Sequence, residues 1–399
     1  MFLEIVLAII LGIMTGTITG LVPGVHINLI SAIVLSSSLF LSNLISPIIL
    51  MIFIVSMAIT HTFLDFIPSI YLGAPDPDSV LSILPGHDFL LKGKAHSAIL
   101  YTLYGSLLAL PIILIFTPIF IFFLPPIYEH IKTVIPIILI LASIFLIFQE
   151  KNSKVWAVMI FLLSGFLGIS TLNLHLQQPL LPLLTGLFGG SSLISSIIKK
   201  QKIPKQQLVK IKITKKQLSR TIYSASLSAP IFSFLPALGA NQSAIISSQI
   251  IKNPSQEEFL ILLGIINTVI MALSFITLQT ISYSRTGAAI AIHQITESLS
   301  KEHIILILLT VIVSGIISFF LGKQISKIFA HNLVKINYKK VSITILAFLT
   351  ITTIYFSGII GLLVFITSNF LGLFVILLGV KRTYLMGCLM IPTVIFYLL

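Results

Sequence analysis

Charged side chains are scarce in this chain. Only 9% of its 399 residues are Asp, Glu, Lys or Arg, whereas 57% are apolar and the mean hydropathy is +1.12. A soluble domain carries roughly a quarter charged residues, which cover its surface with groups that water solvates. The composition therefore excludes an ordinary soluble domain of this length.

Cysteine is almost absent, and the motifs of common catalytic sites are missing. The single cysteine, Cys388, excludes an internal disulfide and a cysteine-based metal site. The chain has no G-x-x-x-x-G-K-[ST] phosphate loop, no H-E-x-x-H zinc motif, and no paired aspartates or Ser/His pair within an apolar run. The sequence therefore predicts no enzyme activity, no ATP hydrolysis and no bound cofactor.

What the chain has in abundance is long apolar runs. A run of about 17–25 residues crosses about 30 Å of hydrocarbon as a helix. Backbone groups in lipid must bond internally, and these runs are too continuously apolar for barrel strands. We expect an all-α polytopic protein of the cell membrane with roughly 10–14 membrane segments. The expected segments are residues 2–22, 25–42, 44–72, 95–124, 133–149, 155–172, 178–198, 221–236, 239–251, 258–283, 303–322, 341–357, 358–378 and 383–399.

The net charge of +13 is concentrated in the connections between these runs. Residues 199–220 carry nine Lys or Arg and no acid, and residues 323–340 carry five Lys. Basic connections face the cytoplasm, where they meet anionic lipid, so nucleic acid is not an expected partner. The first connection divides the chain into a first membrane repeat (1–198), a basic cytoplasmic linker (199–220) and a second membrane repeat (221–399).

The two halves resemble each other at three places. Residues 21–37 (LVPGVHINLISAIVLSS) resemble residues 234–248 (FLPALGANQSAIISS), Gly73 pairs with Gly287, and the tripeptide ending at Gly168 pairs with the one ending at Gly372. The offset stays near 204–214 residues across these three places. A steady offset in three ordered matches predicts an internal repeat.

Loop charge predicts that the repeats have opposite orientations. Residues 323–340 are basic, whereas the equivalent residues 125–132 (PPIYEHIK) are nearly neutral. Equivalent loops are therefore assigned to opposite sides of the membrane, as in the inverted-topology repeats of many secondary transporters. The alternative is that loop charges this sparse fit the scheme by chance.

A helix break is expected near the start of the first half. Pro23 removes an amide donor, and Gly24 admits backbone angles that other residues avoid. A new apolar helix then begins with His26, Asn28 and Ser31 near its N-terminus. Inverted-repeat carriers commonly bind substrate at such interrupted helices.

The second half carries an equivalent break. Pro236 and Gly239 interrupt the apolar run, and Asn241, Gln242 and Ser243 follow. Helix N-termini attract anions, and two such ends from an inverted repeat would face each other near the membrane midplane, where freed carbonyls offer ligands to a cation such as Na⁺. The alternative is a pair of kinked helices whose polar residues are ordinary N-caps.

A polar stretch in the first half supplies further candidates. Residues 67–93 contain four prolines, and Asp76 and Asp78 are candidates for binding a coupling cation or proton, with helix capping as the alternative. We place Gly73 and its counterpart Gly287 at the substrate site. Arg285 precedes Gly287 closely and is a candidate for an anionic substrate, because a guanidinium grips a carboxylate with two donors.

His61 and Asp65 stand four residues apart in an otherwise apolar run and therefore share a helix face. Ionisable groups inside membrane spans are costly and indicate function, here a proton relay or ion-coupling site. The alternative is an ion-paired or surface-facing site near the helix end, because Pro68 is expected to end the span.

Several motifs resemble the TctA family, the large membrane subunit of tripartite tricarboxylate transporters. Residues 20–24 (GLVPG) are similar to the family's G-x-x-P-G signature, and residues 73–93, continuing to 105, are similar to its G-x-P-x-x … G-x-x-x-x-x-x-G stretch. Residues 184–193 (LTGLFGGSSL) and 379–392 (GVKRTYLMGCLMIP) resemble a shorter archaeal-type branch. The resemblance covers nearly the whole chain.

This resemblance implies a permease that takes up citrate-like carboxylates with a cation gradient, together with an extracytoplasmic binding protein and a small membrane subunit. The sequence thus predicts a secondary-active transporter of a small organic anion, such as a di- or tricarboxylate, coupled to Na⁺ or H⁺. The alternative functions are a membrane channel and a non-transporting membrane scaffold.

Overall fold

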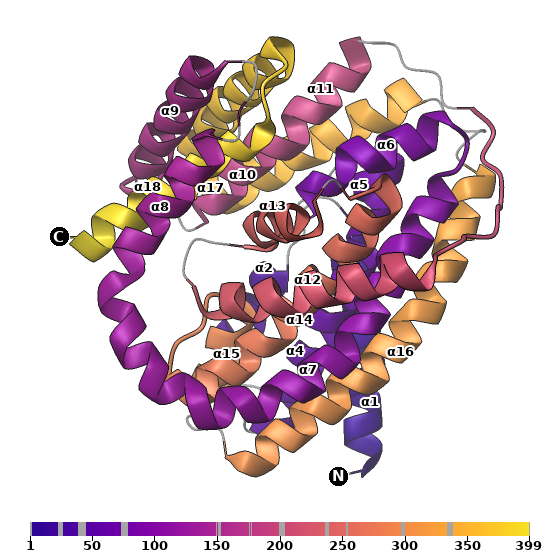
Figure 1. Cartoon of the computed structure of the whole chain (residues 1–399), viewed down its shortest axis with the longest axis vertical. Coiled ribbons are helices and arrows are strands. Elements are labelled where there is room, and N and C mark those ends of the chain that lie inside the picture. The colour runs from indigo at the N-terminus through magenta and orange to yellow at the C-terminus, as the bar shows by residue number, and fades with distance from the viewer. Residues whose placement is uncertain are drawn as a thin grey trace.

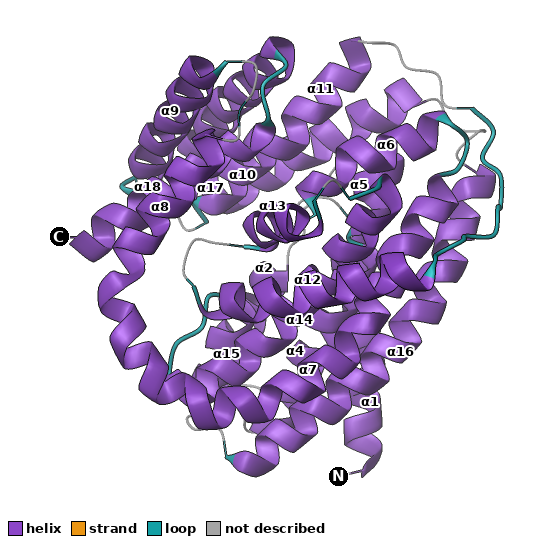
Figure 2. Cartoon of the chain, viewed as in Figure 1, coloured by secondary structure: helices purple, strands orange, loops and turns teal. Residues whose placement is uncertain are grey.

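The computed structural model describes residues 2–22, 27–38, 45–72, 79–148, 150, 153–174, 176, 178–198, 204–235, 239–252, 254–296, 300–332 and 338–398. Over these ranges the protein is helical and contains no strand (Figure 2). Among the described residues, seven helices are long and apolar enough to cross a membrane, and three shorter apolar helices accompany them. The expected all-α polytopic membrane fold is confirmed.

The first half runs from α1 to α11. Its elements are α1 (Phe2–Leu21), α2 (Ile27–Ser36), α4 (Pro47–Leu64), α5 (Phe66–Leu72), η1 (Val80–Ser82), α6 (Ile83–Leu91), α7 (Ala95–Ile131), η2 (Lys132–Val134), α8 (Ile135–Phe148), α9 (Lys154–Leu172), α10 (Leu180–Leu184), the π-helix η3 (Thr185–Gly190) and α11 (Ser191–Ile198).

The second half runs from α12 to α18. Its elements are α12 (Lys215–Phe234), α13 (Ala240–Ile251), α14 (Gln256–Ile281), α15 (Gly287–Thr296), α16 (Lys301–Asn332), α17 (Tyr338–Leu378), η5 (Arg382–Met386) and α18 (Gly387–Leu398). Gly358 interrupts α17 with φ +66° and ψ −165°, at the expected boundary between two segments. In each half a long helix is followed by a short helix and then by a long buried one.

The helices form two groups that lie side by side (Figure 1). In one group α4 and α14 are the most buried of the candidate spans, and α1, α7, α12 and α16 surround them. The other group contains α8, α9 and α18 together with α10, α11 and α17. The large apolar side chains on the outer helices are exposed, as expected where lipid covers them.

Contacts in the second group are reciprocal. A side chain at Gly186 would meet the Phe365 carbonyl and Ser368, and a side chain at Gly387 would meet the Phe161 carbonyl and Ser164. Phe161 and Phe365 are 204 residues apart, as are Ser164 and Ser368. Such exchange of equivalent contacts is what a two-fold relation between two copies produces. It supports the predicted repeat, whereas the inverted orientation and the division at the linker stay predictions.

Glycines allow α1 to approach α4 closely. Gly12 faces Ser56, Gly16 faces the Met57 carbonyl, and Gly20 faces Leu64. The Ser56 hydroxyl also donates to the Ile9 carbonyl at 2.9 Å, so a hydrogen bond joins the two helices next to Gly12. Small residues at every fourth position permit this packing in lipid, where close van der Waals contact holds helices together.

Helix α7 is long and strongly curved (Figure 1). Pro111, Pro118 and Pro125 are seven residues apart and therefore lie near one face, where each removes a backbone hydrogen bond. The expectation of a loop at residues 125–132 is wrong, because the helix continues through Ile131 and a 3₁₀ turn leads into α8. The adjacent Pro125 and Pro126 therefore lie within the helix and do not end it.

The linker is partly helical and partly an extended strap. Helix α12 begins at Lys215, inside the predicted linker, and its first turn is closed by a capping box between Thr214 and Gln217. Residues 204–214 are extended and lie against the corner between α6 and α7. There the Gln206 amide accepts from the Ala95 N–H at 3.0 Å and donates to the Leu90 carbonyl at 3.1 Å.

Replacing Gly105 with Ala is expected to destabilise the fold. Gly105 on α7 lies against the Ile261 carbonyl of α14, and no side chain fits unless the helices separate. Overpacking a tight core costs about 1–3 kcal/mol. The measurement is the melting temperature of the detergent-solubilised protein. Gly189→Ala is the control, because its methyl group would meet only Leu349 at 3.7 Å. Equal melting temperatures for the two variants would contradict the expectation.

Candidate functional site

The described helices flank both expected breaks. Helix α1 ends at Leu21 and α2 begins at Ile27, while α12 ends at Phe234 and α13 begins at Ala240. The predicted site residues that lie outside the described residues are Pro23, Gly24, His26, Gly73, Asp76, Asp78 and Pro236. The remaining candidates can be placed on the structure.

One short segment of the second half contacts both broken-helix regions. Residues 284–288 lead from α14 into α15. The Ala288 N–H donates to the Asn28 side-chain oxygen at 3.2 Å, and the Arg285 guanidinium donates to the Phe232 carbonyl at 3.5 Å. Asn28 lies in the first turn of α2, and Phe232 lies in the last turn of α12. The structure thus brings together three of the predicted residues, namely Asn28, Arg285 and the neighbouring Gly287.

The N-terminus of α13 is held by its own side chains. The Gly239 N–H donates to the Gln242 side-chain oxygen at 2.8 Å, which closes the first turn. The Ser243 hydroxyl donates to Ser228 on α12 at 3.0 Å, so α12 and α13 form a bonded hairpin. Asn241 beside them is only 1% exposed. Gln242 and Ser243 therefore have structural contacts in addition to their proposed contact with a ligand.

Near its break each half has a buried polar atom for which the described residues provide no hydrogen-bond partner. In the first half this atom is the Ser31 hydroxyl, and in the second it is the Gln242 side-chain nitrogen. Both residues are fully or almost fully buried. A buried polar group without a partner costs free energy, which a bound ligand would offset. Such an atom is a candidate contact for a polar ligand.

Asp65 lies at the junction of α4 and α5 and is 1% exposed. Its carboxylate accepts a hydrogen bond from the Asn267 amide of α14 at 2.9 Å. His61, one turn earlier, bonds to the Thr19 hydroxyl of α1 at 3.1 Å. The expectation that the span ends at Pro68 is wrong. The interruption falls at Asp65, and Pro68 lies in the first turn of α5, where proline is tolerated.

Asp65 is also close to the first broken-helix region. Gly20, in the last turn of α1, faces Leu64 and the Asp65 backbone nitrogen. Helix α1 ends one residue later, and the expected break follows. A buried carboxylate, an interrupted helix and the end of α1 therefore meet in one place.

Sequence reasoning did not identify Asn267, which comes from the opposite half. A weak signal exists, because residues 59–63 (ITHTF) resemble residues 265–269 (IINTV) at an offset of 206. In the structure Thr62 and Thr268, which are equivalent in this comparison, bond to each other at 3.2 Å. Asn267 is then the counterpart of His61, and the counterpart of Asp65 is Met271. At these two equivalent positions the first half has a buried carboxylate and the second half has methionine.

Residues 6–387 match the model of the tripartite tricarboxylate transporter TctA family. The chain belongs to the TctA family. An uncharacterized protein of Methanocaldococcus jannaschii is 30% identical over 356 residues, which cover 87% of this chain and 88% of the relative. No solved structure matches. The predicted family is confirmed, and the archaeal relative agrees with the archaeal-type branch.

Membership of the TctA family settles the broad class of the protein. The family is one of multi-pass membrane proteins that belong to a transporter, and it is not a family of enzymes. Its name describes a tripartite system for tricarboxylates. Among the described residues, no three His, Cys, Asp or Glu side chains lie close enough to form a metal site.

Proposed function

We propose that this chain is a secondary-active permease for a small organic anion, such as a di- or tricarboxylate. The substrate site lies where residues 284–288 meet the two broken-helix regions. The observation that carries the proposal is that this segment contacts both regions, through Asn28 and through Arg285. The unpartnered polar atoms of Ser31 and Gln242 support it, because they provide one ligand contact from each half.

The chemistry of these groups suits an anion. The N-terminus of α13 offers backbone N–H groups and a partial positive charge. The N-terminus of α15 adds a partial positive charge, although its Ala288 and Ala289 N–H groups already donate to Asn28 and Thr286. The Arg285 guanidinium adds a full charge and can grip a carboxylate with two parallel hydrogen bonds. Asn241 and Gln242 add amide donors that favour a polar substrate over a lipid chain.

We propose Asp65 as the site of the coupling ion, with His61 as its neighbour. A carboxylate buried in a membrane span is costly unless a bound cation or proton neutralises its charge. Binding Na⁺ or H⁺ there neutralises the carboxylate next to the end of α1, where the first broken-helix region begins. Asp76 and Asp78 stay candidates for the same role.

The tripartite family name supports two protein partners for this chain. We propose an extracytoplasmic binding protein, which delivers the substrate, and a small membrane subunit. Co-purification of both with the tagged chain from its native membranes would support them. A chain that transports alone in liposomes and co-purifies with neither would contradict this part of the proposal.

Transport in reconstituted liposomes tests the function directly. Labelled di- and tricarboxylates are supplied under an imposed Na⁺ or H⁺ gradient, and their internal concentration is followed. Accumulation that depends on the gradient supports the permease. Equilibration without accumulation would indicate the alternative of a channel, and no movement of any carboxylate would favour a scaffold.

Replacing Asn28 or Asn241 with Ala is expected to raise the KM for transport without reducing expression. Each variant loses one neutral hydrogen bond, which contributes about 0.5–1.5 kcal/mol, or about 2–10-fold in KM. Initial rates of uptake over a range of substrate concentrations measure the change. Gln294→Ala, an exposed amide on α15, is the control. An unchanged KM in both asparagine variants would remove these residues from the site.

A further inference from the structure

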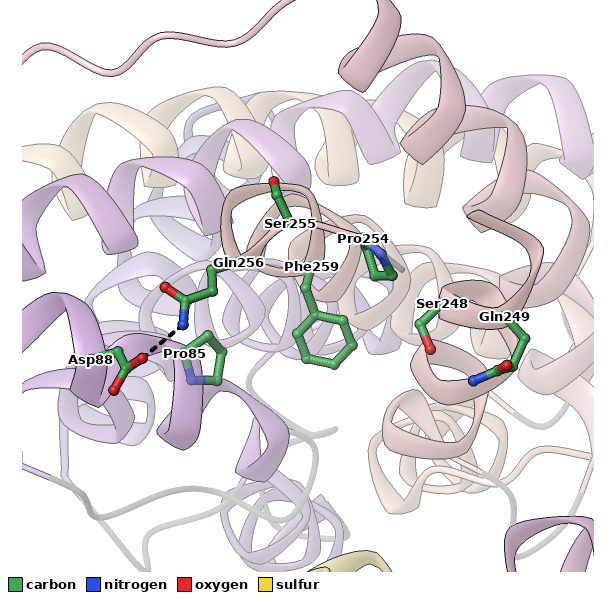
Figure 3. Close-up of a pocket in the computed structure, with 8 residues that line it drawn as sticks. All are labelled: Pro85, Asp88, Ser248, Gln249, Pro254, Ser255, Gln256 and Phe259. Atoms are coloured by element: carbon green, nitrogen blue, oxygen red, sulfur yellow. Dashed lines mark hydrogen bonds between the residues drawn. The ribbon is translucent and has the colours of Figure 1, made fainter. Parts of the chain in front are cut away.

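A cavity of about 580 Å³ lies between the two halves (Figure 3). Helix α6 of the first half forms one wall, and the C-terminal part of α13 with the start of α14 forms the other. The cavity is lined by Pro85, Asp88, Ser248, Gln249, Pro254, Ser255, Gln256 and Phe259. Five of these eight side chains are polar, so the cavity offers hydrogen-bonding groups to water and polar solutes.

The cavity lies on the same side of the protein as the basic linker. The strap of residues 204–214 is bonded through Gln206 to Leu90, two residues beyond Asp88 on α6. On the other wall, Arg220 at the start of α12 bonds to the Ile251 carbonyl and lies 3.7 Å from the Glu258 carboxylate. Because basic connections face the cytoplasm, the mouth of the cavity faces the cytoplasm.

One face of α13 connects the cavity with the proposed substrate site. Asn241, Ile245, Ser248 and Gln249 follow the i, i+4, i+7, i+8 spacing of a single helix face. Their exposure rises along this face, from buried Asn241 through half-buried Ile245 and Ser248 to exposed Gln249. The distance along the axis from Asn241 to Ser248 is about 10 Å. The opposite face, with Ser243, is bonded to α12.

A hydrogen bond joins the two walls on the α6 side of the cavity. The Gln256 amide of α14 donates to the Asp88 carboxylate of α6 at 2.8 Å (Figure 3). It links the first half to the second at an exposed position, where water competes with it. A bond of this kind can open and close without disturbing the buried helix contacts.

We propose that this cavity is the cytoplasmic entrance to the substrate site, and that the Asp88–Gln256 bond holds it partly closed. The carboxylate substrate passes along the face of α13 that carries Asn241, Ile245, Ser248 and Gln249. The inference rests on the proposed permease function for its substrate. The accessibility of the cavity from the cytoplasm is independent of that function and is tested without transport.

Reaction of introduced cysteines tests the entrance. A negatively charged, membrane-impermeant thiol reagent is applied to either side of the membrane in oriented vesicles. Ser248→Cys is expected to react from the cytoplasmic side only, and Ser300→Cys, before α16, from the outer side only. Ser243→Cys on the buried face and the native buried Cys388 are expected to stay unmodified.

The outcomes decide between the alternatives. Reaction of Ser248→Cys from the outer side would contradict the proposal that the cavity is the cytoplasmic entrance. The same holds if Ser248→Cys does not react while Ser300→Cys does. Gln249→Cys replaces the first variant if that one does not fold. A cavity that reacts as expected in a chain that moves no carboxylate would overturn the permease and leave the entrance standing. Transport of carboxylates by a chain whose Ser248→Cys does not react would contradict the entrance and support the permease.

The role of the bond is tested in the Ser248→Cys background. Gln256→Ala removes the bond without changing charge and leaves the Ser255–Glu258 capping box of α14 intact. The rate of modification is expected to rise by about tenfold, which corresponds to losing one hydrogen bond to a charged group. Gln249→Ala, which also lines the cavity, is the control. Equal rates in the two variants would show that the bond does not close the entrance.

Discussion

Replacing Asp65 with Asn is expected to abolish accumulation of substrate while exchange across the membrane continues. Asparagine keeps an oxygen that accepts from Asn267, so the contact between α4 and α14 is retained. It cannot bind a proton reversibly and is a much weaker ligand for Na⁺. A tenfold gradient of one coupled monovalent cation supports about tenfold accumulation, and this ratio is expected to fall to about one.

Two assays in the same liposomes separate coupling from binding. Accumulation under an ion gradient measures coupling, and counterflow of labelled substrate against unlabelled substrate measures movement through the site. Glu129→Gln removes an exposed carboxylate at the end of α7 and serves as the control. Full accumulation by Asp65→Asn would refute the coupling role. Loss of both activities in a folded protein would place Asp65 in substrate binding instead.

Replacing Arg285 with Ala is expected to lower kcat/KM for carboxylate transport by about 10–100-fold. Hydrogen bonds to a charged group contribute about 1.5–3 kcal/mol, and each 1.4 kcal/mol is a factor of ten. Arg285 lies on the segment that contacts both broken-helix regions and bonds to the end of α12. Arg285→Lys keeps the charge without the planar pair of donors, so an intermediate loss is expected.

The control for this experiment is a cation far from the segment. Lys154 begins α9 in the other helix group and lies 5.1 Å from the Phe148 ring. Lys154→Ala is expected to transport like the unmodified chain. If Arg285→Ala keeps the original KM for every carboxylate that is transported, the guanidinium does not hold the substrate.

Local chemistry explains which parts of the fold were predictable. The ends of α1 and α12 follow from proline and glycine, whose effects on the backbone need no knowledge of distant residues. The four-residue spacing of Gly12, Gly16 and Gly20 is likewise a local pattern, and these glycines contact α4. Proline was misleading inside α7 and at Pro68, because neighbouring helices and the first turn of a helix both tolerate it.

Long-range partners were not predictable in the same way. Asn267 stands in an apolar run, and its partner Asp65 is 202 residues away. The contact depends on how α4 and α14 cross, which no local pattern specifies. Arg285 was a candidate by residue type alone. Its position between the two broken-helix regions follows only from the packing of residues 284–288 against α2 and α12.

The bond between Thr62 and Thr268 has a consequence for how such a site can change in evolution. In a dimer of two identical chains, a residue on the symmetry axis meets its own copy, and every substitution appears twice. An acid near that axis would then bring a second acid with it, and two like charges at close range repel each other. In a single chain the two sides are encoded separately. Under the predicted internal repeat, one side can therefore carry Asp65 while the other keeps Met271 at the equivalent position.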